Sequence, residues 1–171
     1  KAPRILERDL SIARIAVFTQ LFNHQGGTER LRGISNALRA WPHELIVHDV
    51  ADSKSSVDYV RKLLATKRIE GLIFSGVPIH EEVAMNVQRF ELPTVLIDID
   101  DSRFSRVLTS EKKGCELAAD YFNKSGATNV LFLGARPSAI DINPGIRLKS
   151  FRERLMPEKR AASVELLVDP L

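Results

Sequence analysis

One strand–helix–strand cycle decides the fold class: residues 71–98 read GLIFSGVPIHEEVAMNVQRFELPTVLID. The apolar runs 71–74 and 94–97 are short, bounded by turn residues and rich in β-branched and aromatic side chains, which predicts two buried strands. Between them, Val83, Val87 and Phe90 recur at helical spacing. Near-continuous apolar strands joined by an amphipathic helix indicate parallel strands covered on both faces.

The same alternation extends in both directions from this cycle. Strands are predicted at 15–18, 45–47, 106–108, 130–134 and 164–168, and helices at 28–41, 57–68, 111–124 and 147–156. Gly26-Gly27 is predicted to be a flexible turn before the first helix. The apolar face of helix 28–41 is expected to include Trp41, and that of helix 111–124 is expected to consist of Leu117, Ala118, Tyr121 and Phe122. Right-handed crossovers between such strands produce doubly wound α/β sheets, whose ligands bind outside the carboxyl ends of the strands.

Composition excludes several classes of protein. The chain has 171 residues, 44% of them apolar, and 25 Lys+Arg against 22 Asp+Glu. These values are typical of a globular protein without a strongly basic nucleic-acid surface. No run of 18 apolar residues predicts a membrane span, and the first thirty residues are too charged for a secretory signal. A single cysteine, Cys115, excludes an intramolecular disulfide framework and favours a cytoplasmic location.

The motifs of catalysis and cofactor binding are missing. The sequence has no phosphate-binding Gly-x-x-x-x-Gly-Lys-Ser/Thr, no Gly-x-Gly-x-x-Gly after the first strand, and no Gly-x-Ser-x-Gly elbow. Its four histidines lack zinc-binding spacing. We therefore expect no catalytic residues, no metal and no cofactor, and a binding protein in place of an enzyme. An α/β enzyme would need a catalytic constellation on the loops after the strands.

Two residues remain as candidates for ligand binding. Asp98 stands at the carboxyl end of the predicted strand 94–97, where a carboxylate accepts hydrogen bonds from ligand hydroxyls. It could equally cap the following turn, or hold a cation together with Asp100. Arg147 is predicted at the start of a helix, where the dipole mildly disfavours a cation. It is therefore a candidate donor to a polyol or carboxylate, with an ordinary surface arginine as the alternative.

The order and spacing of several segments resemble the effector-binding core of the lactose/galactose-repressor family, which shares the periplasmic sugar-binding-protein fold. The resemblance runs from about residue 14 to residue 151. It is carried by Arg14-Ile15-Ala16-Val17, Leu31-Arg32-Gly33-Ile34, Ile69-Glu70-Gly71-Leu72-Ile73, Leu92-Pro93-Thr94-Val95-Leu96-Ile97-Asp98, Gly114, Ala118-Ala119, Gly126, Val130, Leu133-Gly134 and Arg147-Leu148-Lys149-Ser150-Phe151.

The resemblance implies a two-lobed core that binds a small, sugar-like effector between its lobes. It implies effector contacts by Asp98 and Arg147, and more weakly by the following residues: Gln25, Ser75, Asp141 and Asn143. The sequence departs from the family pattern at His24-Gln25-Gly26, where proline and aromatic residues are usual, and at Ser110-Glu111. These departures leave the identity of the effector open.

The implied organisation has three parts. Residues 1–14 are expected to form a hinge or linker arm, 15–105 the N-terminal lobe, and 106–171 the beginning of a C-terminal lobe that is incomplete in this chain. The resemblance further implies a homodimer that binds operator DNA through a helix-turn-helix module outside this chain, and no membrane partner. A transport-linked periplasmic sugar-binding protein of the same fold is the alternative.

Overall fold

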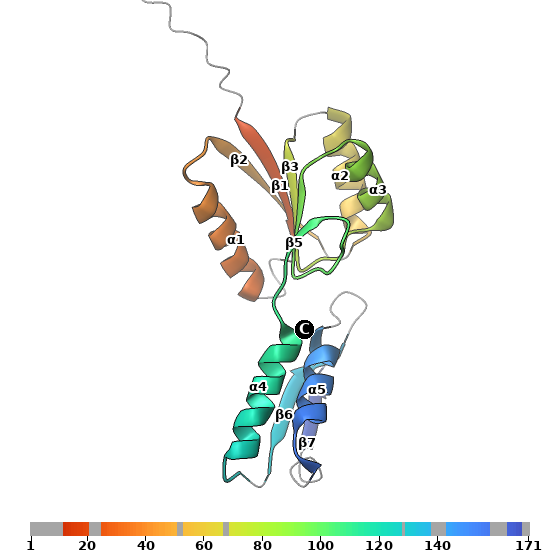
Figure 1. Ribbon diagram of the computed structural model, residues 1–171. Helices are drawn as coiled ribbons and strands as arrows, with labels where there is room; N and C mark the ends of the chain where they lie inside the picture. Colours follow the sequence, from red (N-terminus) through yellow and green to blue (C-terminus); the bar gives the residue numbers. More distant parts are fainter. Residues whose placement is uncertain are drawn as a thin grey trace, which may run out of the picture. The chain divides into compact units, whose positions relative to one another are not determined.

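The computed structural model describes residues 12–20, 25–50, 53–66, 69–127, 129–137, 143–157 and 164–168 (Figure 1). The chain divides into two compact units, Lys1–Val107 and Leu108–Leu171. Each unit contains parallel strands with helices packed against them, so the predicted α/β class is confirmed. Within the described ranges, no helix is long and apolar enough to cross a membrane.

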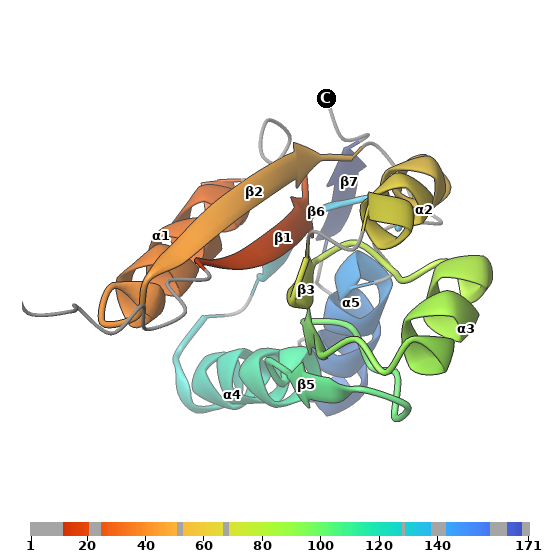
Figure 2. The same cartoon turned by 90° about the horizontal axis from the view of Figure 1, so that it is seen from above.

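Unit 1 is a doubly wound sheet. Its five strands are all parallel and lie in the order β2-β1-β3-β4-β5, with bounds β1 (Ala13–Thr19), β2 (His43–Asp49), β3 (Gly71–Ser75), β4 (Thr94–Ile97) and β5 (Ser105–Val107). Helix α1 (Gln25–Leu38) covers one face of this sheet, and α2 (Ser55–Thr66) and α3 (Glu81–Arg89) cover the other (Figures 1 and 2). Strand β5, at the edge, is the segment that the sequence predicted as a short strand near 106–108.

The main core lies between the sheet and helices α2 and α3. Phe18 and Phe74 are fully buried there, with their rings stacked at a centroid distance of 4.9 Å. The rest of this cluster comes from the strands, from α2 and α3, and from the loops next to them, namely Ala16, Val50, Val60, Ile69, Leu72, Val77, Val83, Val87 and Leu96. The predicted spacing is confirmed for Val83 and Val87, whose side chains face the sheet, whereas Phe90 caps the end of α3 and is 59% exposed.

The start of α1 differs from the prediction. Gly26 and Gly27 form part of its first turn, so their interpretation as a flexible turn was wrong. A Cβ atom on Gly27 would lie 2.6 Å from the carbonyl oxygen of Gln20, so only glycine lets the helix begin this close to the end of β1. At the other end the helix stops at Leu38, and Trp41, which was predicted on its apolar face, is 70% exposed.

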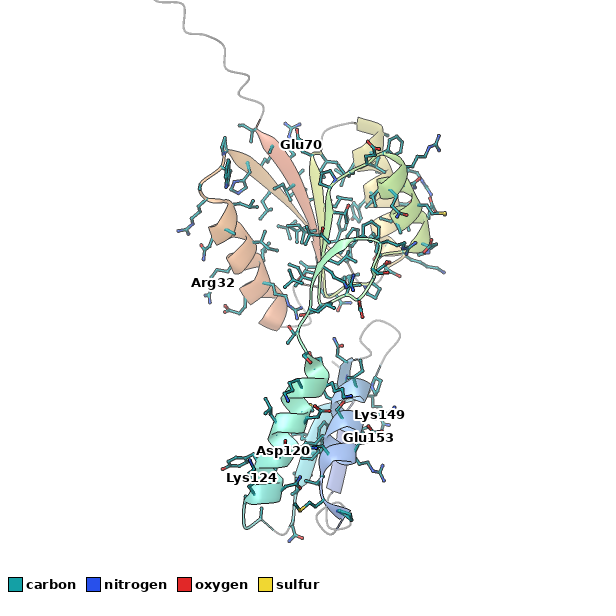
Figure 3. The ribbon with its side chains drawn as sticks, viewed as in Figure 1. Arg32, Glu70, Asp120, Lys124, Lys149 and Glu153 are labelled. Atoms are coloured by element: carbon teal, nitrogen blue, oxygen red, sulfur yellow. The ribbon has the colours of Figure 1, made fainter. Side chains whose placement is uncertain are left out.

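Unit 2 contains α4 (Glu111–Lys124), β6 (Leu131–Ala135), α5 (Asn143–Arg154) and β7 (Val164–Val168), with β6 and β7 parallel. Its buried core consists of Ala119, Val130, Phe151 and Leu155, with Cys115, Phe122 and Phe132 packed against it. Burial, followed by the charge of Glu111, raises the pKa of Cys115, as expected for a structural thiol. Salt bridges between α4 and α5 include Arg154 with Asp120, which Figure 3 labels on α4.

The packing face of α4 was predicted only in part. Phe122 packs against the core, but Leu117 and Tyr121 are 57% and 71% exposed. The face toward α5 is made by Cys115, Ala119 and Phe122 instead. Helical spacing alone did not identify the buried side chains correctly, because apolar residues occur on more than one face of α4.

His48 on β2 lies in a partly buried aromatic stack. Its ring centroid is 4.9 Å from that of Phe18 and 4.6 Å from that of Tyr59 on α2. Its Nε2 atom is buried and has no hydrogen-bond partner in the described part of the chain. Burial lowers the pKa of His48 below its ordinary value of 6.5, because the charged form loses solvation.

This lowered pKa predicts a loss of stability in mild acid. The unfolded chain takes up a proton at His48 near pH 6.5, whereas the folded chain resists it. The free energy of unfolding is therefore unaffected by this group above pH 6.5, and falls as the pH drops below that value and through the folded-state pKa. Denaturant unfolding of His48→Phe over this range is expected to show a weaker pH dependence than the parent. His43→Gln serves as the control, and an unchanged profile for His48→Phe would contradict the prediction.

Candidate functional site

The strand order of unit 1 reverses between β1 and β3. The chain passes from β1 to β2 on one side of β1, and then crosses to β3 on its other side. In open α/β sheets, ligands bind at the carboxyl ends of the strands at such a reversal. Here β1 ends at Thr19 and β3 at Ser75, which are partners in the register. This edge of unit 1 is the candidate functional site.

Ser75 is one of the predicted site residues, and it is 2% exposed. Leu72 and Phe74 pack toward α2 and α3, so by strand alternation Ser75 lies on the opposite face, which α1 covers. Its register partner Thr19 lies on the same face. The Ser75 hydroxyl has no hydrogen-bond partner among the residues that the structure describes. A buried polar group of this kind is costly unless something binds it.

Asp98 follows β4 at the same edge of the sheet. Its backbone adopts the left-handed conformation, with φ of +57°, which aspartate tolerates better than most residues. Its backbone N–H donates to the carbonyl oxygen of Val107 at 2.8 Å, so the turn is held against β5. The side chain is 11% exposed, and its Oδ2 accepts a hydrogen bond from Arg30.

Arg30 on α1 is a site residue that the sequence reasoning missed. Its Nη2 atom donates to Asp98, and its Nη1 atom lies 3.1 Å from the position of a Cβ atom on Gly76. Gly76 has φ of +70° and directly follows β3. Arg30 therefore lies beside the ends of both β3 and β4. Arg30 stands in the second turn of α1, beyond the reach of the helix dipole, so no local signal in the sequence pointed to it.

Gln25, another predicted site residue, is the first residue of α1. Its backbone thus stands where the helix begins, near the end of β1, although its side chain lies outside the description. Gly27 keeps this helix start close to Gln20. The N-terminus of α1 therefore lies at the same edge of unit 1 as the ends of the strands.

The remaining predicted site residues belong to unit 2. Arg147 lies in the second turn of α5, and donates to both carboxylate oxygens of Glu111 at 2.6 and 2.8 Å. Glu111 is the first residue of α4, so this pair of hydrogen bonds joins the N-terminal part of α5 to the start of α4. Asn143 opens α5, and Asp141 lies outside the described residues. Arg147 is thus positioned by a residue at which the sequence departs from the family pattern.

The alternative of a cation site at Asp98 and Asp100 finds no support. Asp100 pairs with Arg106 at 2.9 Å, and Asp101 pairs with Arg103 at 2.7 Å. Hydrogen bonds from Arg103 hold the pKa of Asp101 below its ordinary value. Among the described residues, no group of three or more His, Cys, Asp or Glu side chains could hold a metal ion. Arginines therefore neutralise the acidic loop after β4.

Comparisons with known proteins bear on the fold. No family model and no curated protein sequence matches the chain. Among solved structures, it is similar to the transcription regulator GntR from Chromobacterium violaceum, with 21% identity, a TM-score of 0.74, and coverage of 92% of this chain and 58% of that one. The dimeric Lac repressor with an 11-residue C-terminal deletion matches at 20% identity and a TM-score of 0.69, over 91% and 58% of the two chains.

A third similar structure is the Cra transcriptional dual regulator from Pseudomonas putida in complex with fructose 1-phosphate. It is 17% identical, with a TM-score of 0.71, and 91% of this chain aligns with 58% of that chain. The fold is therefore that of the LacI-type transcription regulators, which is the periplasmic-binding-protein-like fold implied by the resemblance. The chain spans 58% of the length of the first two structures that it matches.

Proposed function

We propose that the chain is the ligand-sensing and dimerisation part of a repressor-type transcription regulator. A small sugar-like effector would bind between the two lobes and alter DNA binding by a helix-turn-helix module. The single observation that carries this proposal is the position of Asp98. This residue directly follows Ile97, the register partner of buried Ser75, at the carboxyl ends of the strands, in a fold shared with transcription regulators.

The chemistry of the two units suits a hydroxylated ligand. Asp98 and the Ser75 hydroxyl supply acceptors and a donor from unit 1, and the Arg147 guanidinium supplies directed donors from unit 2. Regulation would follow from differential affinity, because an effector shifts the protein toward the arrangement that it binds better. A coupling of about 1–3 kcal/mol changes operator affinity about 5- to 150-fold.

The partners are proposed from the similar structures. One of them is a dimer of the Lac repressor bound to operator and an anti-inducer, and another holds fructose 1-phosphate. By analogy, this protein would form a homodimer, bind operator DNA, and act in the cytoplasm without catalysing a reaction. These assignments rest on a likeness of fold.

Substitution of Asp98 or Arg147 tests the site. A thermal-shift screen over sugars, sugar phosphates and purines identifies an effector, since a ligand at a hundredfold over its Kd stabilises by about 2.7 kcal/mol. Calorimetry on the complete gene product should then show Asp98→Ala and Arg147→Ala binding it about 10- to 150-fold more weakly, because each removes a charged hydrogen-bonding group worth about 1.5–3 kcal/mol.

Arg154→Ala is the matched control for Arg147→Ala. Arg154 makes a comparable two-oxygen pair with Asp120, also between α5 and α4, so its loss perturbs the packing of unit 2 in the same way. The control should bind the effector like the parent. Parental binding by both Asp98→Ala and Arg147→Ala would refute the assignment of the site.

The regulatory role needs a second measurement. Operator binding by the complete gene product, with and without the effector, should differ by the coupling factor given above. A helix-turn-helix encoded upstream of Lys1 would support this role. A secretion signal in that position would favour a transport-linked binding protein of the same fold and overturn the proposal.

A further inference from the structure

We propose that unit 1 carries a second ligand site, a groove between the edge strand β2 and helix α2 that binds a planar aromatic acid. The groove has a volume of about 380 Å³, within the range of about 300–1,000 Å³ that small-molecule sites occupy. Its lining residues come from two strands and one helix, namely Arg14, Glu44, Ile46, His48, Tyr59, Lys62 and Leu63. This inference goes beyond the proposed function, because the groove lies on the face of the sheet opposite to α1.

The strand side of the groove follows from the alternation of side chains. Glu44, Ile46 and His48 are every second residue of β2, so their side chains share one face of the strand. Ile46 packs against the core beneath α2 and α3, which places all three on that face of the sheet. Arg14 lies beside them, because it is the register partner of Glu44 on β1. Since β2 is the edge strand of the described sheet, no neighbouring strand closes the groove on that side.

The helix side of the groove is one face of α2. Tyr59, Lys62 and Leu63 stand three and four residues apart, which puts them on the same side of the helix. Leu63 also packs against the core, so this side of α2 faces the sheet. Tyr59 is 45% exposed, and its ring centroid lies 4.6 Å from that of His48. The groove therefore combines the aliphatic side chains of Ile46 and Leu63 with two aromatic rings, which suits a flat apolar ligand.

The charges of the groove favour an anion. Among the described residues, Glu44 is the one acid that lines it, and Arg14 neutralises this acid in an ion pair of 2.6 Å. Lys62 has neither an ion pair nor a hydrogen bond within the described part of the chain, so its positive charge is left over. A carboxylate on the ligand would receive charge-assisted hydrogen bonds from the Lys62 ammonium while the ring of the ligand packs on Tyr59.

His48 supplies an independent indication of a ligand. Its ring packs on those of Phe18 and Tyr59, and its buried Nε2 atom has no hydrogen-bond partner among the described residues. A buried polar atom of this kind is costly while it stays unpaired. Burial lowers the pKa of His48, so the ring is neutral at pH 7 and can pair with a hydroxyl. A hydroxyl on the aromatic ring, opposite the carboxylate, would supply the missing partner.

Titration of the complete gene product with three related probes tests this proposal. The first probe, 6-hydroxynaphthalene-2-carboxylate, is a planar aromatic acid. Its carboxamide keeps the ring without the charge, and its fully hydrogenated analogue, 6-hydroxydecalin-2-carboxylate, keeps the charge without the aromatic ring. We expect the aromatic acid to bind about tenfold more tightly than either of the others, and more weakly at high salt. Its binding should shift the imidazole NMR signals of His48 and the amide signals of Ile46 and Lys62.

Two substitutions separate the contributions of charge and ring. Lys62→Gln should abolish the preference for the acid over its carboxamide, and Lys54→Gln is the matched control, because Lys54 is exposed just before α2 and does not line the groove. Tyr59→Ala should abolish the preference for the aromatic acid over its hydrogenated analogue. Its control is Tyr121→Ala, since Tyr121 is 71% exposed and belongs to unit 2. Circular dichroism confirms that each variant is folded.

Three results would overturn the inference. They are equal affinity for the aromatic acid and its carboxamide, an unchanged preference in Lys62→Gln, and no saturable binding of the aromatic acid at millimolar concentration. Probe binding that weakens as the protein concentration rises would also overturn it, because a second copy of the chain would then occupy the groove. The proposed function is tested separately, since none of these variants changes Asp98 or Arg147.

Discussion

Replacing Phe74 with alanine is expected to lower the free energy of unfolding of unit 1 by about 3–5 kcal/mol. Phe74 is fully buried on β3, and its ring stacks on that of Phe18 at 4.9 Å. The substitution removes an aromatic side chain and leaves a cavity where the sheet meets α2 and α3. Denaturant unfolding followed through the amide NMR signals of β1 and β3 measures this loss separately from events in unit 2.

Phe90→Ala provides the matched control. Phe90 is also a phenylalanine of unit 1, but it is 59% exposed at the end of α3, so its removal should change stability by no more than about 0.5 kcal/mol. A loss below about 1 kcal/mol for Phe74→Ala would contradict the close packing described for this core.

Gly27→Ala is expected to destabilise unit 1 and to weaken effector binding. The new methyl group would approach the Gln20 carbonyl to 2.6 Å, and a backbone atom cannot move away as a side chain can. The resulting strain costs about 1–3 kcal/mol, which exceeds the gain of up to about 1 kcal/mol from replacing a helical glycine by alanine. Relief of this strain moves the start of α1, and with it Arg30, away from the strand ends.

Gly26→Ala isolates the steric effect, because the two positions are adjacent in the first turn of α1. A Cβ atom at Gly26 meets no heavy atom within 4 Å, so this variant should match the parent in stability or exceed it. Unfolding measurements on both variants, with calorimetry on an identified effector, give the comparison. Equal stabilities would show that α1 adjusts its start without cost.

Much of the fold is predictable because it depends on local patterns. The apolar runs at 71–74, 94–97 and 164–168 are strands in the structure, and the alternation with helices indicated a parallel, doubly wound sheet. Helix boundaries were less predictable. Gly26 and Gly27 suggested a turn, yet they are helical because the packing of α1 against the end of β1 outweighs their low helix propensity.

Only those residues of the candidate site that lie at the end of a recognisable strand were predictable from the sequence. Asp98 and Ser75 each follow or end a recognisable strand, so their common edge could be inferred. Arg30 could not be found in this way, because its place beside Asp98 depends on how α1 lies against the sheet across a separation of 68 residues. The pairing of Arg147 with Glu111 is similar, since it requires α4 and α5 to pack side by side.

By itself, the sequence determined the class of fold, the direction of the strands, and the edge at which Asp98 would lie. The periodicity of apolar residues and the positions of strand ends depend on neighbouring residues, so they can be predicted from short windows of the sequence. Only the tertiary structure decided which charges meet there, that Ser75 is buried with no partner among the described residues, and that Gly27 brings a helix start against β1. Those features arise from close packing between distant segments, which no local pattern encodes.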